Sequence, residues 1–297
     1  MNPEPTTRPP LVTIIIPCFK HAKYLPEAID SALAQTHPHV EIIVVNDGSP
    51  DETAEVCGRY QGRIRYIEQA NQGLATARNA GIRAATGDYI VPLDADDKLA
   101  PTFIAATLPF IEHTPQTGYV YTDVREFGGY HSEQEAVSTG KRVWDVTRLL
   151  IYNISVCTAL FRKSDWERVG GYCPQFVHGG EDWDFWLSMV ERGMVGHYVP
   201  EALFFYRRHA SGSMWSGMMS RKSAESYALL INRHRHLFEQ YWQELLVEWA
   251  KRYQESFAYI LKVEPLLEEY YHQRPGRMEK YGVPLPIARL LRRLARR

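Results

Sequence analysis

Three carboxylates stand within four residues at Asp94-Ala95-Asp96-Asp97, directly after the apolar segment 88–93. Carboxylates this close repel one another and resist ionisation, and a bound divalent cation removes that conflict. Mg²⁺ and Mn²⁺ prefer carboxylate oxygens and often share them with substrate phosphates. The alternative is a solvated turn in which Asp97 caps a helix. The cluster therefore predicts either a metal site or a polar turn.

A second acidic pair, Glu181 and Asp182, opens a predicted helix behind two glycines and before Trp183. Acids at a helix start can simply cap it or complement its dipole. The functional alternative is a general base that takes a proton from an acceptor hydroxyl. A neighbouring indole would shield such a carboxylate and raise its pKa.

Three further polar residues have both a structural and a functional interpretation. Asp47, in the segment 46–49, could belong to a turn or accept the imide N–H of a pyrimidine base. Arg78 could contact a diphosphate, because a guanidinium suits phosphate geometry, or form a surface salt bridge. His209 ends the segment 206–209 and could bind a metal or a diphosphate, or be a structural histidine.

The elements that must position these residues alternate between strand and helix. In the first half the sequence predicts strands at 11–17, 40–45, 64–67 and 88–93. It predicts helices at 22–35 and 74–85, and a third helix that begins at Ser49, where Ser49 and Glu52 match a capping box. Short, continuous, β-branched runs are typical of buried parallel strands. Because ligands bind beyond the carboxyl ends of parallel strands, the polar clusters should meet at one edge. The prediction is an α/β fold with a mainly parallel sheet flanked by helices.

The second half is less regular. Here the sequence predicts strands at 118–122, 157–162 and 203–207. It predicts helices at 102–112 and 181–192, and a short helix that begins at Ser164, where Ser164 and Glu167 match a capping box. We expect four segments: a disordered N-terminus at 1–10, an α/β domain at 11–219, a helical extension at 220–272, and a basic linker with an amphipathic helix at 273–297.

Charge and composition restrict the partners. The 297-residue chain carries a formal net charge of −1, so nothing favours nucleic acid. In the segment 287–297 an apolar face is surrounded by arginines, which predicts contact with an anionic membrane surface or with a protein. Aromatic residues at 241–271 could form a homo-oligomer interface. With a polar N-terminus and no long apolar run, we expect a cytoplasmic protein, with a peripheral location at the inner face of the cell membrane as the alternative.

The ordered set of Ile14–Phe19, Val45–Ser49, Asn71–Gly81, Gly87–Ile90, Leu93–Asp97 and Glu181-Asp182 resembles the inverting family 2 glycosyltransferases with the GT-A fold. The resemblance covers about residues 11–215. It implies transfer of a sugar from a nucleotide-diphosphate donor, by family default a UDP-sugar, to an acceptor hydroxyl, with Mn²⁺ or Mg²⁺ as cofactor. It further implies bacterial cell-surface polysaccharide or glycolipid synthesis, with a saccharide or lipid-linked acceptor. Lys20 and His21 depart from the asparagine or tyrosine that the family often has there.

The resemblance also implies a role for each matched residue. In the donor site it places Pro17, Phe19, Asp47, Arg78, Asp94, Ala95 and Asp96, with Pro17 and Phe19 at the base, Asp47 at the base edge and Asp94 at the ribose. Asp96 and His209 would hold the metal. Asp182 would be the catalytic base, and Glu181 and Trp183 would orient the acceptor.

Other classes fit the sequence less well. A sugar nucleotidyltransferase would need a glycine-rich, basic phosphate loop after the first strand, and the segment 17–21 contains no glycine. A dinucleotide oxidoreductase would need a GxGxxG motif there. A non-catalytic nucleotide-sugar or partner-binding module remains an alternative, although acids at positions 94, 96 and 182 argue against a degenerate enzyme.

Overall fold

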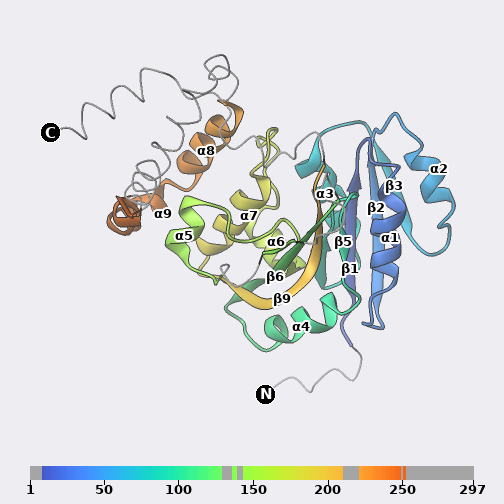
Figure 1. The fold of residues 1–297 in the computed structure, drawn as a ribbon, viewed down its shortest axis with the longest axis horizontal. Helices are drawn as coiled ribbons and strands as arrows, with labels where there is room; N and C mark the ends of the chain where they lie inside the picture. Colours follow the sequence, from blue (N-terminus) through green and yellow to red (C-terminus); the bar gives the residue numbers. More distant parts are fainter. Residues whose placement is uncertain (1–8, 129–135, 139–142, 210–220, 249, 252–297) are drawn as a thin grey trace, which may run out of the picture. The chain divides into compact units, whose positions relative to one another are not determined.

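A computed structural model describes residues 9–128, 136–138, 143–209, 221–248 and 250–251. The chain divides into two compact units, residues 1–241 and 242–297, and the elements discussed below belong to the first (Figure 1). The segment 273–297, the end of the predicted helical extension at 252–272 and residues 1–8 of the predicted N-terminal tail lie outside the described residues.

The first half of the chain has the predicted alternation of strand and helix. Its elements are β1 (Val12–Cys18), α1 (Leu25–Leu33), β2 (Val40–Asp47), α2 (Thr53–Gly58), β3 (Arg65–Gln69), α3 (Leu74–Ala84) and β4 (Tyr89–Pro92). The strands match the predicted ones to within two residues at each end. Every residue of β1 is buried, as expected for a strand covered on both faces.

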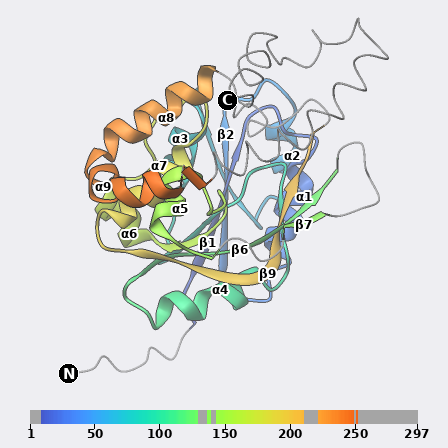
Figure 2. The ribbon, with the colours of Figure 1, turned by 60° about the vertical axis from the view of Figure 1, so that its left-hand side comes forward.

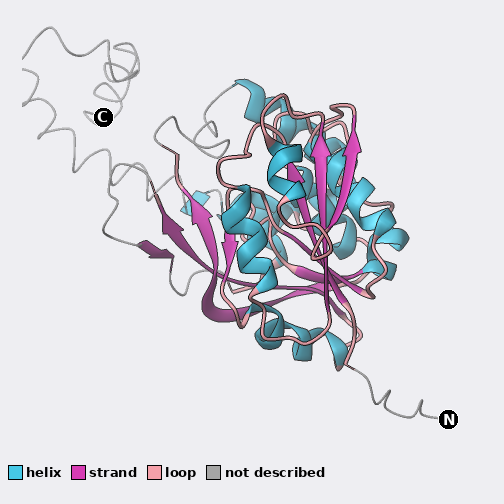
Figure 3. Cartoon of the chain, turned by 90° about the vertical axis from the view of Figure 1, so that its right-hand side faces the viewer, coloured by secondary structure: helices cyan, strands magenta, loops and turns pink. Residues whose placement is uncertain are grey.

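The order of these strands creates the site. β3, β2, β1 and β4 are parallel neighbours in that order, so the chain adds strands on one side of β1 and then returns to the other. Right-handed connections then place α1 and α2 on one face and α3 on the other, and helices cover both faces in Figure 3. Ligands bind at such a reversal, where the loops after β1 and β4 separate. The predicted edge is therefore confirmed.

The second half extends the same sheet. Its elements are β5 (Lys98–Leu99), α4 (Phe103–Glu112), β6 (Thr117–Phe127), β7 (Ala136–Ser138), α5 (Val146–Ile151), β8 (Leu160–Arg162), α6 (Lys163–Val169), α7 (Glu181–Val190), β9 (Val195–Arg207), α8 (Arg221–Arg233) and α9 (Arg235–Gln240). The strand order in the described residues is β3-β2-β1-β4-β8-β6-β9-β5, with β7 beside β6. Only β5, β7 and β8 oppose the common direction, which confirms a mainly parallel sheet.

Two predicted caps are wrong, and so is the alternative interpretation of Asp97 as a cap. α2 begins at Thr53 without a side-chain cap, because Ser49 accepts a hydrogen bond from the Lys20 backbone N–H instead. α6 also has no side-chain cap, since β8 runs directly into it and leaves Ser164 inside the helix. Asp97 does not cap a helix, because β5 follows it.

Candidate active site

The loops after β1 and β2 are tied together at the predicted donor side. The Lys20 backbone N–H donates to Ser49 Oγ at 2.7 Å, and the Ala22 N–H donates to Asp51 Oδ2 at 2.9 Å. Lys20 itself has a φ of +61°, a conformation that costs a side-chain-bearing residue energy. The loop leaves Phe19 41% exposed, while Pro17 is buried in β1. An exposed aromatic ring at this edge can stack on a nucleotide base.

Asp47 is buried and already accepts three hydrogen bonds. Its Oδ1 accepts from Gln69 Nε2 at 2.7 Å and from the Gln72 N–H at 2.9 Å, and its Oδ2 accepts from the Gly73 N–H at 2.8 Å. These bonds hold the backbone that leads into the first turn of α3. The neighbouring Gly48 has a φ of +66°, and a Cβ there would lie 2.7 Å from the Asn71 nitrogen. A base edge could contact Asp47 only through its remaining lone pairs.

Arg78 joins the donor side to the acidic pair on α7. Its Nη2 lies 2.7 Å from Asp94 Oδ1 and its Nη1 lies 2.7 Å from Glu181 Oε1. The guanidinium is only 1% exposed and lies over the Tyr172 ring, 5.4 Å from its centroid. The surface salt bridge considered for Arg78 is therefore wrong, because the residue forms a buried bridge between two carboxylates.

Asp96 lies between two imidazoles. His209 Nε2 is 2.7 Å from Asp96 Oδ2, and His21 Nδ1 is 3.6 Å from Asp96 Oδ1. Burial alone would raise the pKa of Asp96, but hydrogen bonds with both histidines outweigh it and lower that pKa. The same contact with Asp96 raises the pKa of His21. The predicted Asp96–His209 pair is adjacent, and His21, which the sequence marks only as a departure from the family pattern, joins it.

The remaining carboxylate of the cluster, Asp97, points into the protein. It is buried and accepts a hydrogen bond from the Arg207 N–H at 2.7 Å, while Arg207 Nε donates to the Asp96 carbonyl at 2.8 Å. Burial, together with Asp96 and Asp94, raises the pKa of Asp97 well above its usual range. Ligand atoms of Asp94, Asp97 and Cys157 lie within 4.8 Å of one another. Cys157 carries no sequence signal, because only the fold brings it here.

The acidic pair on α7 lies in a low-dielectric setting. Burial raises the pKa of Glu181 to about 7 even though Arg78 opposes the shift. Burial likewise raises the pKa of Asp182, against Arg78 and against a hydrogen bond from Asn153 Nδ2 at 2.8 Å. A carboxylate whose pKa approaches neutrality is suited to general base catalysis.

Trp183, predicted to orient the acceptor, uses its indole N–H and part of its ring for contacts within the protein. Its Nε1–H donates to the Leu149 carbonyl at 2.6 Å, and its ring lies 5.5 Å from that of Tyr227 on α8. Tyr227 in turn donates to the Leu150 carbonyl at 3.2 Å, so α5, α7 and α8 meet here (Figure 2). Only the face or edge of the indole remains for an acceptor.

α8 also holds the middle of α7. Asp184, fully buried one turn after Glu181, accepts from Arg233 Nε at 2.6 Å and lies 3.0 Å from His234 Nε2. On its other side, His234 Nδ1 is 3.1 Å from Glu191 Oε1. The first unit therefore includes α8 and α9, and the acidic pair depends on them for its support.

Replacing Asp184 by Asn should lower the free energy of unfolding by about 2–3 kcal/mol, because a buried ion pair loses one charge while Arg233 stays partly solvated. Urea unfolding followed by tryptophan fluorescence measures this loss. Glu55→Gln, in an exposed pair with Arg59, is the control and should change stability by less than about 0.5 kcal/mol. Equal effects in the two variants would contradict a supporting role for Asp184.

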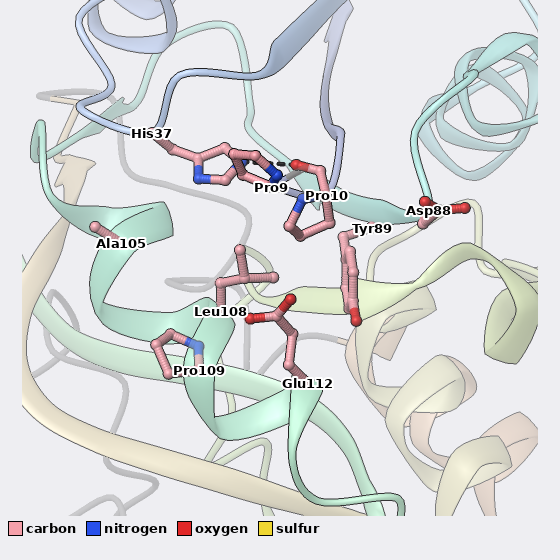
Figure 4. A pocket seen from close by; sticks show the side chains of 9 residues that line it. All are labelled: Pro9, Pro10, His37, Asp88, Tyr89, Ala105, Leu108, Pro109 and Glu112. Carbon is pink, nitrogen blue, oxygen red and sulfur yellow. Dashed lines mark hydrogen bonds between the residues drawn. The ribbon is translucent and has the colours of Figure 1, made fainter. Parts of the chain in front are cut away.

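A cavity of about 580 Å³ lies at the opposite, amino ends of β1 and β4 (Figure 4). Its lining combines prolines, aliphatic residues and four side chains that can ionise: Pro9, Pro10, His37, Asp88, Tyr89, Ala105, Leu108, Pro109 and Glu112. None of the predicted site residues lines it, so it is separate from the edge described above.

Comparison with known proteins agrees with this geometry. The sequence-family model for Glycosyl transferase family 2 matches residues 13–170 of this chain. An uncharacterized glycosyltransferase of Rickettsia prowazekii is 30% identical over 249 residues, which cover 77% of each chain.

Two solved structures share the fold at lower identity. Staphylococcus aureus TarS 1–349 in complex with UDP-GlcNAc has a TM-score of 0.59 and 18% identity, over 69% of this chain and 61% of that one. The mannosyltransferase PcManGT of Pyrobaculum calidifontis, in complex with GDP-Man and Mn²⁺, has a TM-score of 0.59 and 19% identity, over 97% and 80%. Taken with the edge that gathers Asp96, His209 and the acidic pair, these matches establish that the chain belongs to glycosyl transferase family 2 and has the GT-A fold.

Proposed function

We propose that this glycosyltransferase moves a sugar from a UDP-sugar donor to an acceptor hydroxyl with inversion at the anomeric carbon. The observation that carries the proposal is the Arg78 bridge, with 2.7 Å contacts to Asp94 and to Glu181. The bridge joins the loop after β4 to the start of α7, so the donor side and the candidate base Asp182 belong to one rigid site. TarS, whose structure contains UDP-GlcNAc, supports the choice of nucleotide by analogy.

In this proposal the donor lies across the loops after β1, β2 and β4. Phe19 stacks on the base beside Pro17, and Asp47 contacts the base edge. The backbone at Ala95 and the partly exposed Asp94 carboxylate contact the ribose. Arg78 is too deeply buried to reach a diphosphate directly, so it acts by fixing the Asp94 side chain.

The residues present suit a divalent metal. Asp96 and His209 offer a carboxylate oxygen and an imidazole nitrogen 2.7 Å apart, a donor set that Mn²⁺ and Mg²⁺ accept. When bound, the metal supplies positive charge for the diphosphate that leaves. PcManGT, which holds Mn²⁺ with its donor, supports a metal here.

The reaction would be a single in-line displacement. Asp182 takes the proton from the acceptor hydroxyl, and the oxygen attacks the anomeric carbon as its bond to the diphosphate breaks. Attack from the opposite face converts an α-linked donor into a β-linked product. Glu181 and the Trp183 ring would orient the acceptor from the same end of α7.

We further propose a saccharide or lipid-linked acceptor in bacterial cell-surface polysaccharide or glycolipid synthesis. The basic amphipathic segment 287–297 would bring the enzyme to an anionic membrane surface, at the cytoplasmic face. Among the described residues, no helix combines the length and apolar character that crossing a bilayer requires.

Titration calorimetry with UDP, GDP and dTDP, each with and without Mn²⁺, tests the donor site. We expect one nucleotide to bind only with Mn²⁺, and Asp96→Asn to weaken that binding at least about tenfold, since one lost charged ligand contact is worth about 1.4 kcal/mol or more. Glu55→Gln should bind like the wild type. Unchanged Mn²⁺ dependence in Asp96→Asn would overturn the metal assignment, and no binding of any nucleotide would overturn the donor assignment.

A further inference from the structure

Asn153 contacts the candidate base directly. It lies in the loop between α5 and β8, is 9% exposed, and donates from Nδ2 to Asp182 Oδ2 at 2.8 Å. In the sequence this residue stands out only as the first position of Asn153-Ile154-Ser155, a glycosylation sequon. Its burial against Asp182 leaves no room for a glycan on the side chain.

The hydrogen bonding of Asn153 is one-sided. Its Oδ1 is buried and has no hydrogen-bond partner in the described part of the chain, so the contact with Asp182 is the amide's one bond there. A buried amide normally uses both ends, because an unpaired polar atom is costly. Asn79 shows the usual pattern: its Oδ1 accepts from Trp166 Nε1 at 3.1 Å and from the Tyr172 N–H at 2.9 Å, and its Nδ2 donates to the Tyr172 carbonyl at 2.7 Å.

This contrast separates two kinds of buried asparagine. Asn79 ties α3 to the segment after α6 and is explained by structure alone. Asn153 has an unpaired carbonyl oxygen in the described residues, and its amide N–H donates to a carboxylate. An apolar side chain would avoid that cost, so the amide is explained by what it does to Asp182.

We propose that Asn153 is a positioning residue for Asp182, which holds one carboxylate oxygen so that the other faces the acceptor hydroxyl. The inference rests on the proposed role of Asp182 as base. The Asn153 amide donates to Oδ2 and the Trp183 backbone N–H also hydrogen-bonds to the carboxylate, so the side-chain donor fixes a rotation that the backbone donor alone would leave less restricted. Because an amide donates without adding charge, it favours the ionised base and does not pair with it as a lysine would.

The electrostatic effect has a definite sign. A hydrogen bond to the charged form lowers the pKa of Asp182, against the larger effect of burial. The other charged or titratable groups that act on or respond to Asp182 come from α3, the loop after β4, α7 and the segments beside β8 and α6: Arg78, Asp94, Glu181, Cys157 and Tyr172. None of these side chains donates a hydrogen bond to Asp182 in the described residues. The Trp183 backbone N–H also hydrogen-bonds to this carboxylate and lowers its pKa, so Asn153 supplies the side-chain donor beside a backbone donor.

The test is the pKa of Asp182 in the whole chain, followed by ¹³C-carboxyl NMR of aspartate-labelled protein and assigned with Asp182→Asn. We expect Asn153→Ala to raise that pKa by at least about half a unit, from the loss of one hydrogen bond. Asn153→Asp, which keeps the volume, should raise it further. Ile154→Val, in the same segment, is the control and should leave the pKa unchanged. An unchanged pKa in both Asn153 variants would overturn the proposal.

The pH dependence of kcat then connects the pKa to catalysis. UDP release from UDP-sugars with an acceptor panel should show an acidic limb that moves upward in Asn153→Ala by the NMR shift, with UDP–Mn²⁺ binding unaltered. A limb that stays in place, or a loss equal to that in Ile154→Val, would overturn the positioning role. If the wild type itself released no UDP, the proposed function would fail, while the NMR result on Asn153 would still stand or fall separately.

Discussion

Replacing Asp182 by Asn should abolish sugar transfer while leaving nucleotide binding intact. The amide has nearly the same shape but cannot take a proton, and general base catalysis contributes roughly 10²–10⁴-fold to rate. We expect kcat to fall by about that factor, with UDP–Mn²⁺ affinity unchanged, because Asp182 contacts neither Asp96 nor His209 in the described structure. Product formation by mass spectrometry and calorimetry with UDP measure the two effects.

The pH profile of the wild type gives the sign of this effect. Burial raises the pKa of Asp182, so activity should be low below that raised pKa, where the base is protonated, and should rise as pH passes through it. Glu181→Gln is the matched comparison, because Glu181 is equally placed at the start of α7 but pairs with Arg78. Retention of full activity by Asp182→Asn would exclude Asp182 as the base, and an acidic limb retained in that variant would assign it to another group.

Replacing Arg78 by Met should destabilise the protein by about 3–5 kcal/mol, the cost of removing one partner from a buried charge pair. Asp94 and Glu181 each lie 2.7 Å from the Arg78 guanidinium, so the change removes the cation that compensates both carboxylates. Urea unfolding at neutral pH measures the loss. Lowering the pH should restore part of the stability, because a carboxylate whose folded pKa is raised is stabilised when protonated, and that stabilisation is lost as pH rises through the folded pKa.

Arg59→Met is the matched control for this experiment. Arg59 pairs with Glu55 at the same 2.7 Å, but both side chains are exposed, so we expect a loss below about 1 kcal/mol. Arg78→Lys should recover only part of the stability, since an ammonium cannot reach both carboxylates in the planar geometry of a guanidinium. A loss in Arg78→Met no larger than in Arg59→Met would show that the bridge does not hold the two sides of the site together.

Several features of the fold and the site could be predicted from the sequence. The mostly apolar, β-branched runs at 11–17 and 40–45 predict strands, and the structure has them at Val12–Cys18 and Val40–Asp47, because parallel strands buried on both faces need no polar alternation. The clusters that follow strands meet at one edge because parallel strands end on the same side. Asp96 and His209, 113 positions apart, were paired by family resemblance, and the structure places them 2.7 Å apart.

Other features depend on distant segments and carry no local signal. β9 extends over Val195–Arg207 because it pairs with β6 along its whole length, whereas the sequence indicates only 203–207. Ser49 and Ser164 match a capping box, yet a contact with Lys20 in one case and a continuous strand-to-helix junction in the other override the local preference.

By itself, the sequence determined the order of strands and helices, the edge where polar residues gather and the acids that could act there, because these follow from local patterns of burial and from strand direction. Only the tertiary structure decided what each residue contacts: that Arg78 is buried between Asp94 and Glu181, that His21 joins Asp96, and that Asn153 holds Asp182. These partners lie 16 to 103 positions apart in the chain and meet only when the sheet has formed and α7 packs beside it. The low dielectric that raises the pKa of the acidic pair arises from the same packing.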